Sequence, residues 1–236
     1  MMKKRFALTL MAFVLTHVAL HAQGEGPTIA PTATFINIQG EEVDTTSYSD
    51  SAPLEARFYA NPSNVGAYHA TYEWRFYLER EEEPYLVRYE EDTDYTFTTA
   101  GSHRIACYAT FINGNDTVRD GKEYFTVTIY ESKLVFPNAF SPNNGDGKND
   151  IYRAKEFQSI VEFHAYIFNR WGQKLFEWDN PADGWDGTYK GKEVKEGVYF
   201  CLVKAKGADG RKFNFRKDVN LLRGYTEKAS SSSTDQ

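Results

Sequence analysis

Residues 102–131 read SHRIACYATFINGNDTVRDGKEYFTVTIYE. Apolar and polar side chains alternate on both sides of the dipeptide Asn113-Gly114. A period of two puts successive side chains on opposite faces of an extended strand, and Asn-Gly accepts the positive φ angles that a tight hairpin requires. The stretch therefore predicts a long β-hairpin within a fold of antiparallel sheets.

Shorter alternating runs precede this hairpin, separated by clusters of turn-forming residues. The expected strands are 33–38, 54–60, 70–78, 85–89, 95–98, 102–112 and 117–131. Many short strands without a helical period between them predict a β-sandwich. Trp74 shares one face of its expected strand with Tyr72 and Phe76, so we expect a core tryptophan there, with ligand stacking as the alternative.

One segment of this half resembles a known domain. Residues 95–103 read YTFTTAGSH and lead into the long hairpin. Together they resemble the later strands of a PKD-like Ig domain, over about residues 28–131. The WDFGDG-type loop of that family is replaced here by WRFYLERE at 74–81. The resemblance implies an Ig-type sandwich at residues 33–132, without the loop function of the PKD family.

The chain changes character at Leu134. Residues 135–150 read VFPNAFSPNNGDGKND, which is dense in turn formers. Alternating runs follow at 160–171, 174–178, 197–206 and 211–223. They predict a second, smaller sandwich at residues 133–225, so the expected fold class is all-β with two consecutive β-sandwich domains. The Ser-rich residues 226–236 lack periodicity and are expected to be a disordered tail.

Four motifs follow one another in this second half. They are FPNAFSPN at 136–143, NGDGKND at 144–150, IFNRWG at 167–172, and GWDGT at 184–188 with GVYF at 197–200. In this order they resemble the gliding-motility-associated C-terminal domain, the type B sorting domain of the type IX secretion system. The resemblance spans about residues 134–225. It implies Sec passage, export across the outer membrane, and retention at the cell surface by an outer-membrane β-barrel protein of the PorP/SprF type.

Four residues in these motifs are candidates for contacting such a partner: Arg170, Trp171, Trp185 and Asp186. Rigid aromatic side chains and guanidinium groups are enriched at binding hot spots. The alternative is structural, with the rings covering bare glycine backbone and Asp186 capping the next turn. Both interpretations stay open at the level of sequence.

The NGDGKND motif offers a candidate calcium loop. Asn144, Asp146 and Asp150 alternate as calcium ligands do, but Lys148 stands where another acid would be useful and no glutamate closes the loop. Turn chemistry is the alternative. No cofactor and no other metal site is expected.

The sequence holds no recognisable catalytic motif. The histidines beyond the N-terminal segment, His69, His103 and His164, are isolated, and nucleophile elbow, P-loop and His-Glu-x-x-His patterns are missing. The chain is therefore not expected to be an enzyme.

The N-terminal segment has the layout of a secretory signal peptide. Three basic residues at 3–5 precede an apolar run at 6–20 and the small residue Ala22. We expect a signal peptide at 1–22 and a linker at 23–32, with an uncleaved anchor as the alternative, and no spanning segment after it. Cys107 and Cys201 lie in separate apolar strands, so buried free thiols are expected rather than a disulfide.

Charge divides the chain. Residues 23–133 hold 8 basic and 19 acidic side chains, whereas residues 134–225 hold 15 and 12. An acidic first half argues against nucleic acid as a partner. Thr45, Ser51 and Thr117 lie in Asp-Ser/Thr-apolar or similar triplets that resemble the O-glycosylation motif of bacteria with this secretion system.

These observations predict a non-enzymatic cell-surface protein, exported through the periplasm and associated with the outer membrane by its C-terminal domain. A subunit of the secretion or gliding machinery is one form of this prediction. The alternative is an adhesin or glycan-binding module that uses Tyr77, Tyr85, Tyr89 and the loop 79–83.

Overall fold

The computed structural model describes residues 26–223. Every helix or strand assigned among them is a β-strand, so the all-β fold class is confirmed. The first group of strands is β1 (Thr28–Ile29), β2 (Thr32–Ile36), β3 (Glu42–Asp44), β4 (Ser47–Asp50), β5 (Leu54–Tyr59), β6 (Pro62–Ser63), β7 (His69–Leu78), β8 (Leu86–Arg88), β9 (Asp92–Phe97), β10 (Gly101–Asn113) and β11 (Asp116–Ile129). The second group is β12 (Lys133–Val135), β13 (Ala139–Phe140), β14 (Glu156–Gln158), β15 (Ile160–Phe168), β16 (Lys174–Trp178), β17 (Thr188–Tyr189), β18 (Lys192–Glu193), β19 (Gly197–Gly207) and β20 (Lys212–Leu221). The predicted signal peptide and Ser-rich tail lie outside the described residues.

The N-terminal sandwich packs two sheets against each other. One has the strand order β4-β11-β10-β7-β8 and the other β3-β2-β5-β9. Trp74 is completely buried between them, as predicted. Its indole Nε1 donates to the Glu91 carbonyl at 3.1 Å, so the polar end of the ring is satisfied inside the core.

The C-terminal sandwich is built on one five-stranded sheet, in the order β13-β20-β19-β15-β16. The inner face of this sheet, which includes Phe140 of β13, packs on the aromatic side chains of Phe136, Tyr152 and Trp185. These residues belong to a buried cluster separate from that of the N-terminal sandwich. The backbones of Tyr152 and Trp185 exchange two hydrogen bonds, at 2.8 and 3.0 Å. This bridge ties the GWDGT motif to the segment that follows NGDGKND.

Several strand boundaries differ from the predicted ones. The long hairpin turns at Gly114-Asn115, one residue later than expected, because Asn113 still pairs with Asp116. The run predicted to continue to Trp171 ends at Phe168, where a turn begins. The short strands β3 and β4 were not predicted, since each pairs with a single neighbouring strand and is largely solvent-exposed, which leaves little apolar alternation to detect.

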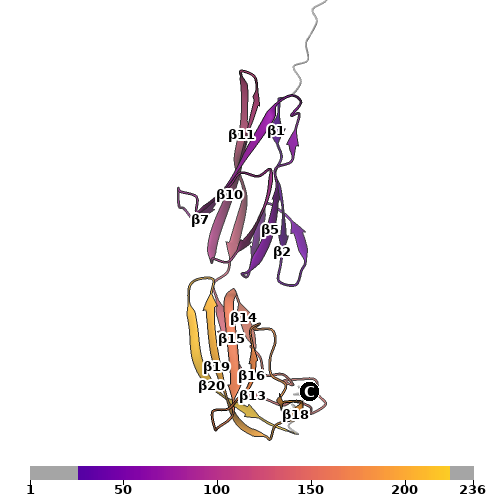
Figure 1. Cartoon of the computed structure of the whole chain (residues 1–236), viewed down its shortest axis with the longest axis vertical. Helices are drawn as coiled ribbons and strands as arrows, with labels where there is room; N and C mark the ends of the chain where they lie inside the picture. Colours follow the sequence, from indigo (N-terminus) through magenta and orange to yellow (C-terminus); the bar gives the residue numbers. More distant parts are fainter. Residues whose placement is uncertain (1–25, 224–236) are drawn as a thin grey trace, which may run out of the picture.

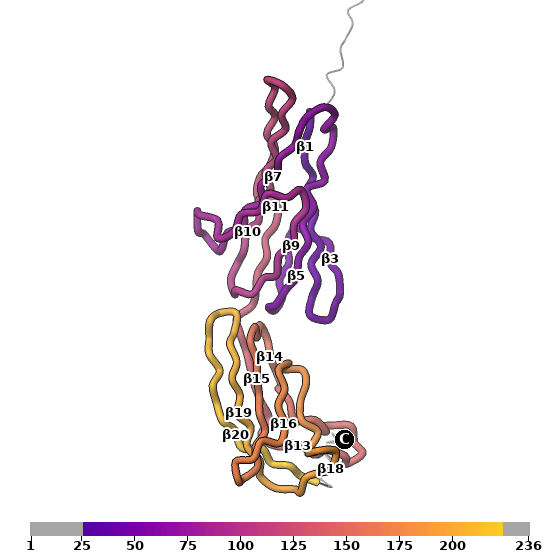
Figure 2. The backbone as a smooth tube through the Cα atoms, in the orientation of Figure 1, coloured from indigo at the N-terminus to yellow at the C-terminus, as the bar shows by residue number. Residues whose placement is uncertain are grey.

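The two sandwiches lie end to end along the long axis of the molecule (Figure 1). Hydrogen bonds join them directly: Ala52 N donates to Ser159 Oγ at 3.1 Å, and Ala100 N donates to the Ala208 carbonyl at 3.0 Å. The tip of the β10–β11 hairpin lies at the end of the molecule remote from the C-terminal sandwich (Figure 2). The chain therefore presents two distant ends.

Cys107 and Cys201 are free and buried, as predicted, one in each sandwich. Among residues 26–223, no helix has the length and apolar character that crossing a bilayer requires.

Candidate functional site

A tight turn between β15 and β16 displays two of the predicted partner-binding residues. The Asn169 side-chain oxygen accepts hydrogen bonds from the backbone N–H groups of Trp171 and Gln173, both at 3.0 Å. Gly172 adopts φ 79°, a left-handed conformation that suits glycine. The turn holds Trp171 outward with 75% of the residue exposed, and the Arg170 guanidinium carbon lies 4.3 Å from the centre of its ring.

Trp185 does not belong to this surface, and its predicted role as a partner contact is wrong. The residue is 0% exposed, and its ring packs on Phe140 and Tyr199 in the core. Its Nε1 donates to the Thr188 carbonyl at 2.8 Å. The neighbouring Asp186 is exposed, but its carboxylate accepts from the N–H and hydroxyl of Thr188 at 2.9 and 2.8 Å. Both residues therefore stabilise the GWDGT turn.

The outer face of the five-stranded sheet extends the surface around Arg170 and Trp171 with residues that were not predicted. Phe168 of β15 pairs with Phe200 of β19, and Leu202 of β19 pairs with Arg216 of β20. The Arg216 guanidinium carbon lies 4.2 Å above the Phe200 ring centre. The alternation of β19 and β20 was visible in the sequence, but only strand pairing brings these side chains together.

Two hollows open on this surface. One of about 380 Å³ is lined by Phe168, Asn169, Arg170, Gly172, Phe200, Leu202 and Arg216. The other, of about 640 Å³, lies beside the exposed Trp171 and Val198. Aromatic and apolar side chains beside charged groups are typical of surfaces that bind a protein segment.

Two of the three side chains of the candidate calcium loop form hydrogen bonds within turns. Asn144 Oδ1 accepts from Asp146 N at 3.0 Å, and Asp146 Oδ1 accepts from Lys148 N at 2.8 Å. Asp150 Oδ1 is buried without a hydrogen-bond partner. Within residues 26–223, no group of three or more His, Cys, Asp or Glu side chains is arranged to hold a metal ion. Calcium coordination needs six to eight oxygens, and Asn144 and Asp146 each use a side-chain oxygen in a turn hydrogen bond.

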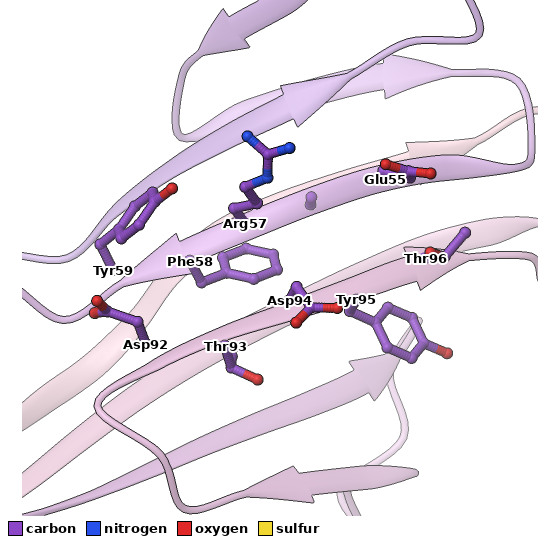
Figure 3. Close-up of a pocket in the computed structure, with 10 residues that line it drawn as sticks. Glu55, Arg57, Phe58, Tyr59, Asp92, Thr93, Asp94, Tyr95 and Thr96 are labelled. Carbon is purple, nitrogen blue, oxygen red and sulfur yellow. The ribbon is translucent and has the colours of Figure 1, made fainter. Parts of the chain in front are cut away.

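The tyrosines proposed for glycan binding are dispersed. Tyr77 is buried, whereas Tyr89 is 71% exposed. The Tyr85 hydroxyl lies 3.0 Å from His103 Nδ1. A separate open hollow of about 430 Å³ lies over β5 and β9 (Figure 3), with Arg57 and Asp94 on directly paired positions. Polar side chains from two adjacent strands are thus displayed on the N-terminal sandwich.

The three candidate glycosylation residues differ in exposure. Thr117 is exposed beside the tip of the β10–β11 hairpin, while Thr45 and Ser51 are half-buried. Access favours Thr117 among the three.

The buried titratable groups are held in their neutral forms. Burial lowers the pKa of His103, whose Nε2 lies 2.8 Å from the Thr99 carbonyl. Burial raises the pKa of Cys107 and of Cys201 to about 12. A neutral thiol is a weak nucleophile, so these cysteines act as core residues.

Residues 134–216 match the CHU_C type IX secretion signal domain. The match contains the NGDGKND, IFNRWG and GWDGT motifs and most of the five-stranded sheet. No curated protein matches the chain.

The solved structures that match the chain are distant from it. One is a mixed-linkage glucan utilization locus protein, SGBP-B, of Bacteroides ovatus, at 14% identity and a TM-score of 0.29, covering 84% of this chain and 48% of that one. Another is dimeric latent PorU from Porphyromonas gingivalis, at 13% identity and a TM-score of 0.24, covering 84% and 20%. A tetra-tandem repeat of a large adhesion protein has 11% identity and a TM-score of 0.27, covering 84% and 68%. At this level of similarity they imply no ligand or partner for this chain.

The family match, the motif order and the sheet that carries them agree. The chain bears a CHU_C type IX secretion signal domain at residues 134–216 and is a protein sorted by the type IX secretion system to the cell surface or outer membrane.

Proposed function

We propose that this protein is a non-enzymatic cell-surface protein whose C-terminal sandwich is both sorting signal and anchor, held by a PorP/SprF-like outer-membrane protein. The observation that carries the proposal is the signal-domain match at residues 134–216. The exposed Arg170–Trp171 turn and the adjacent apolar sheet face supply a surface for an anchor partner. A subunit of the secretion or gliding machinery is the form of this function that we favour.

The end-to-end arrangement supports the same proposal. A partner bound at the C-terminal sandwich leaves the acidic N-terminal sandwich and its hairpin tip at the opposite end (Figure 1). Net negative charge on that end favours solubility and discourages non-specific contact with anionic surfaces.

Surface delivery and partner capture test the function together. Cells expressing the full chain with an epitope at the hairpin tip are treated with external protease, and membrane complexes are then purified through the epitope. We expect protease-sensitive surface protein that recovers the barrel protein, and a version lacking residues 134–223 to stay inside. Native protein that remains free in the periplasm would overturn the proposal.

A second candidate function is glycan binding by the N-terminal sandwich. The observation that favours it is the hollow over β5 and β9, where Arg57, Asp94 and Thr96 offer hydrogen-bonding groups (Figure 3). Selective binding on a glycan array that is lost in an Arg57→Ala variant would support it. An array without selective binding would reject it.

A further inference from the structure

Two arginines on the C-terminal sandwich share an unusual arrangement. Arg170 lies 4.3 Å from the ring centre of Trp171, and Arg216 lies 4.2 Å from that of Phe200. Across residues 26–223, neither guanidinium has a hydrogen bond or ion pair with another residue. Each guanidinium carbon lies over an aromatic ring, and both arginines are solvent-exposed.

Other cations of the same sheet differ in their partners: among the described residues Lys204 and Lys212 form no ion pair, whereas two lysines do. Lys174 pairs with Glu177 at 2.8 Å, and Lys206 pairs with Glu162 at 3.2 Å. The two stacked arginines lack such acids. A guanidinium that packs on an aromatic ring and has no acid partner keeps its N–H donors available to receive a carboxylate through two parallel hydrogen bonds.

Both arginines line the same hollow of about 380 Å³, together with Phe168, Phe200 and Leu202. The paired strands β15 and β19 place Phe168 opposite Phe200, so the apolar floor is continuous between neighbouring strands. The hollow thus combines an apolar floor with two cationic groups. A ligand that fits it carries carboxylate groups on an apolar body.

We propose that this hollow receives a segment of the outer-membrane anchor protein in which Asp or Glu side chains flank an apolar side chain. This rests on the proposed function, and it specifies the surface and the chemistry of the contact. Charge complementarity supports the occupant, because residues 134–225 hold 15 basic and 12 acidic side chains and the two arginines without acids lie at the hollow. If each arginine forms a buried ion pair with the anchor protein, removing the guanidinium should weaken binding strongly, because the opposing carboxylate is left buried without a partner.

The test uses the full chain and the detergent-solubilised PorP/SprF-like protein of the same organism, immobilised for interferometry. An Arg170→Gln/Arg216→Gln variant is compared with Arg80→Gln/Arg88→Gln, which removes the same charge from the N-terminal sandwich. We expect the first variant to bind about 30-fold or more weakly, and the control to bind within about twofold of the unchanged chain. Added NaCl is expected to weaken the unchanged chain more than the first variant.

An Arg170→Lys/Arg216→Lys variant separates geometry from charge. It keeps both positive charges, so we expect weakened binding from loss of the planar guanidinium fork alone. Thermal unfolding of each variant verifies that the sandwich remains folded.

The outcomes distinguish this inference from the proposed function. If the unchanged chain does not bind the barrel protein, the proposed function fails and this occupant fails with it. If the chain binds and the Arg170→Gln/Arg216→Gln variant binds equally well, only this inference is overturned. Arginine-dependent binding to phosphatidylglycerol vesicles, or arginine-dependent self-association in sedimentation, with no effect on barrel binding, also overturns it.

Discussion

At the scale of single residues, Trp171 and Trp185 lie in similar sequence motifs but differ in solvent exposure. Each lies beside a glycine in a turn-rich motif. Trp171 is 75% exposed and Trp185 is 0% exposed. The difference arises because the backbone bridge between Tyr152 and Trp185 draws the second turn into the core.

Replacing each tryptophan by alanine separates the two environments. We expect Trp185→Ala to lower the free energy of unfolding by about 3–5 kcal/mol, since it leaves a large cavity. Trp171→Ala is expected to change it by about 0.5 kcal/mol or less, while weakening binding to the anchor protein. Urea unfolding measures both, and equal losses of stability would contradict the assigned environments.

His103 couples the stability of the N-terminal sandwich to pH. Tyr85 and the Thr99 carbonyl occupy its two ring nitrogens, and burial lowers its pKa below the ordinary value of 6.5. The native state therefore resists protonation while the unfolded state accepts it. As pH falls from 6.5 toward the lowered pKa of the folded state, stability is lost progressively.

We expect the free energy of unfolding to fall between about pH 7 and pH 5, and a His103→Gln variant to show a smaller slope. His69→Gln is the control, because His69 is exposed. Denaturant titrations across this pH range measure the slopes. A slope unchanged in His103→Gln would remove His103 as its source.

At the scale of elements, glycine positions shape the strands. Gly121 lies at φ 138° in β11, and a Cβ there would meet the Cys107 carbonyl oxygen at 2.3 Å. Gly197 begins β19 with nearly the same φ of 140°, but a Cβ there would meet nothing within 4 Å. Both glycines adopt a backbone conformation that residues with a side chain rarely adopt. The two sites differ in the space available to an added side chain.

Gly197→Ala is expected to cost about 1–3 kcal/mol of stability from backbone strain alone. Gly121→Ala adds steric overlap against the partner strand, so we expect a loss larger by about 1–3 kcal/mol. Urea unfolding of the two variants gives the comparison. Equal losses would show that β10 and β11 separate to accommodate the methyl group.

At the scale of the whole molecule, the junction decides whether two sandwiches act as one body. Ala208 in the β19–β20 turn is buried, and it accepts from Ala100 and donates to the Ser159 carbonyl. Ser132 Oγ donates to Asp209 at 2.6 Å beside it. These hydrogen bonds join the two sandwiches at the junction, and we expect them to limit their relative motion.

Spin labels at Ile38→Cys and Val198→Cys measure the rigidity of this junction. Both positions are exposed, and the native thiols are buried. We expect one narrow distribution of distances between the two labels. The Ala208→Arg substitution should broaden it, because a long cationic side chain does not fit the buried site and would disrupt the junction. The exposed Ala182→Arg is the control, and a distribution that is broad before any substitution would contradict a fixed junction.

Strands were predictable from the sequence where one face of the strand is buried and the other is exposed, because apolar and polar residues then alternate. The run at 174–178 matches β16 to the residue, and β7, β10 and β19 differ from their predicted bounds by only one residue at either end. The short edge strands and the end of β15 were not predictable, because exposure removes the alternation and Gly172 redirects the chain. In the candidate site, Arg170 and Trp171 were predictable from residue type, and Arg216 was not.

The all-β fold, the two sandwiches and the secretion signal domain were predictable because alternation and motif order can be recognised along the linear chain without knowledge of long-range contacts. Which tryptophan faces solvent, which arginines lack acidic partners, and how the two sandwiches meet could not be predicted in this way. These depend on contacts between residues such as Phe200 and Arg216, which adjoin only through strand pairing.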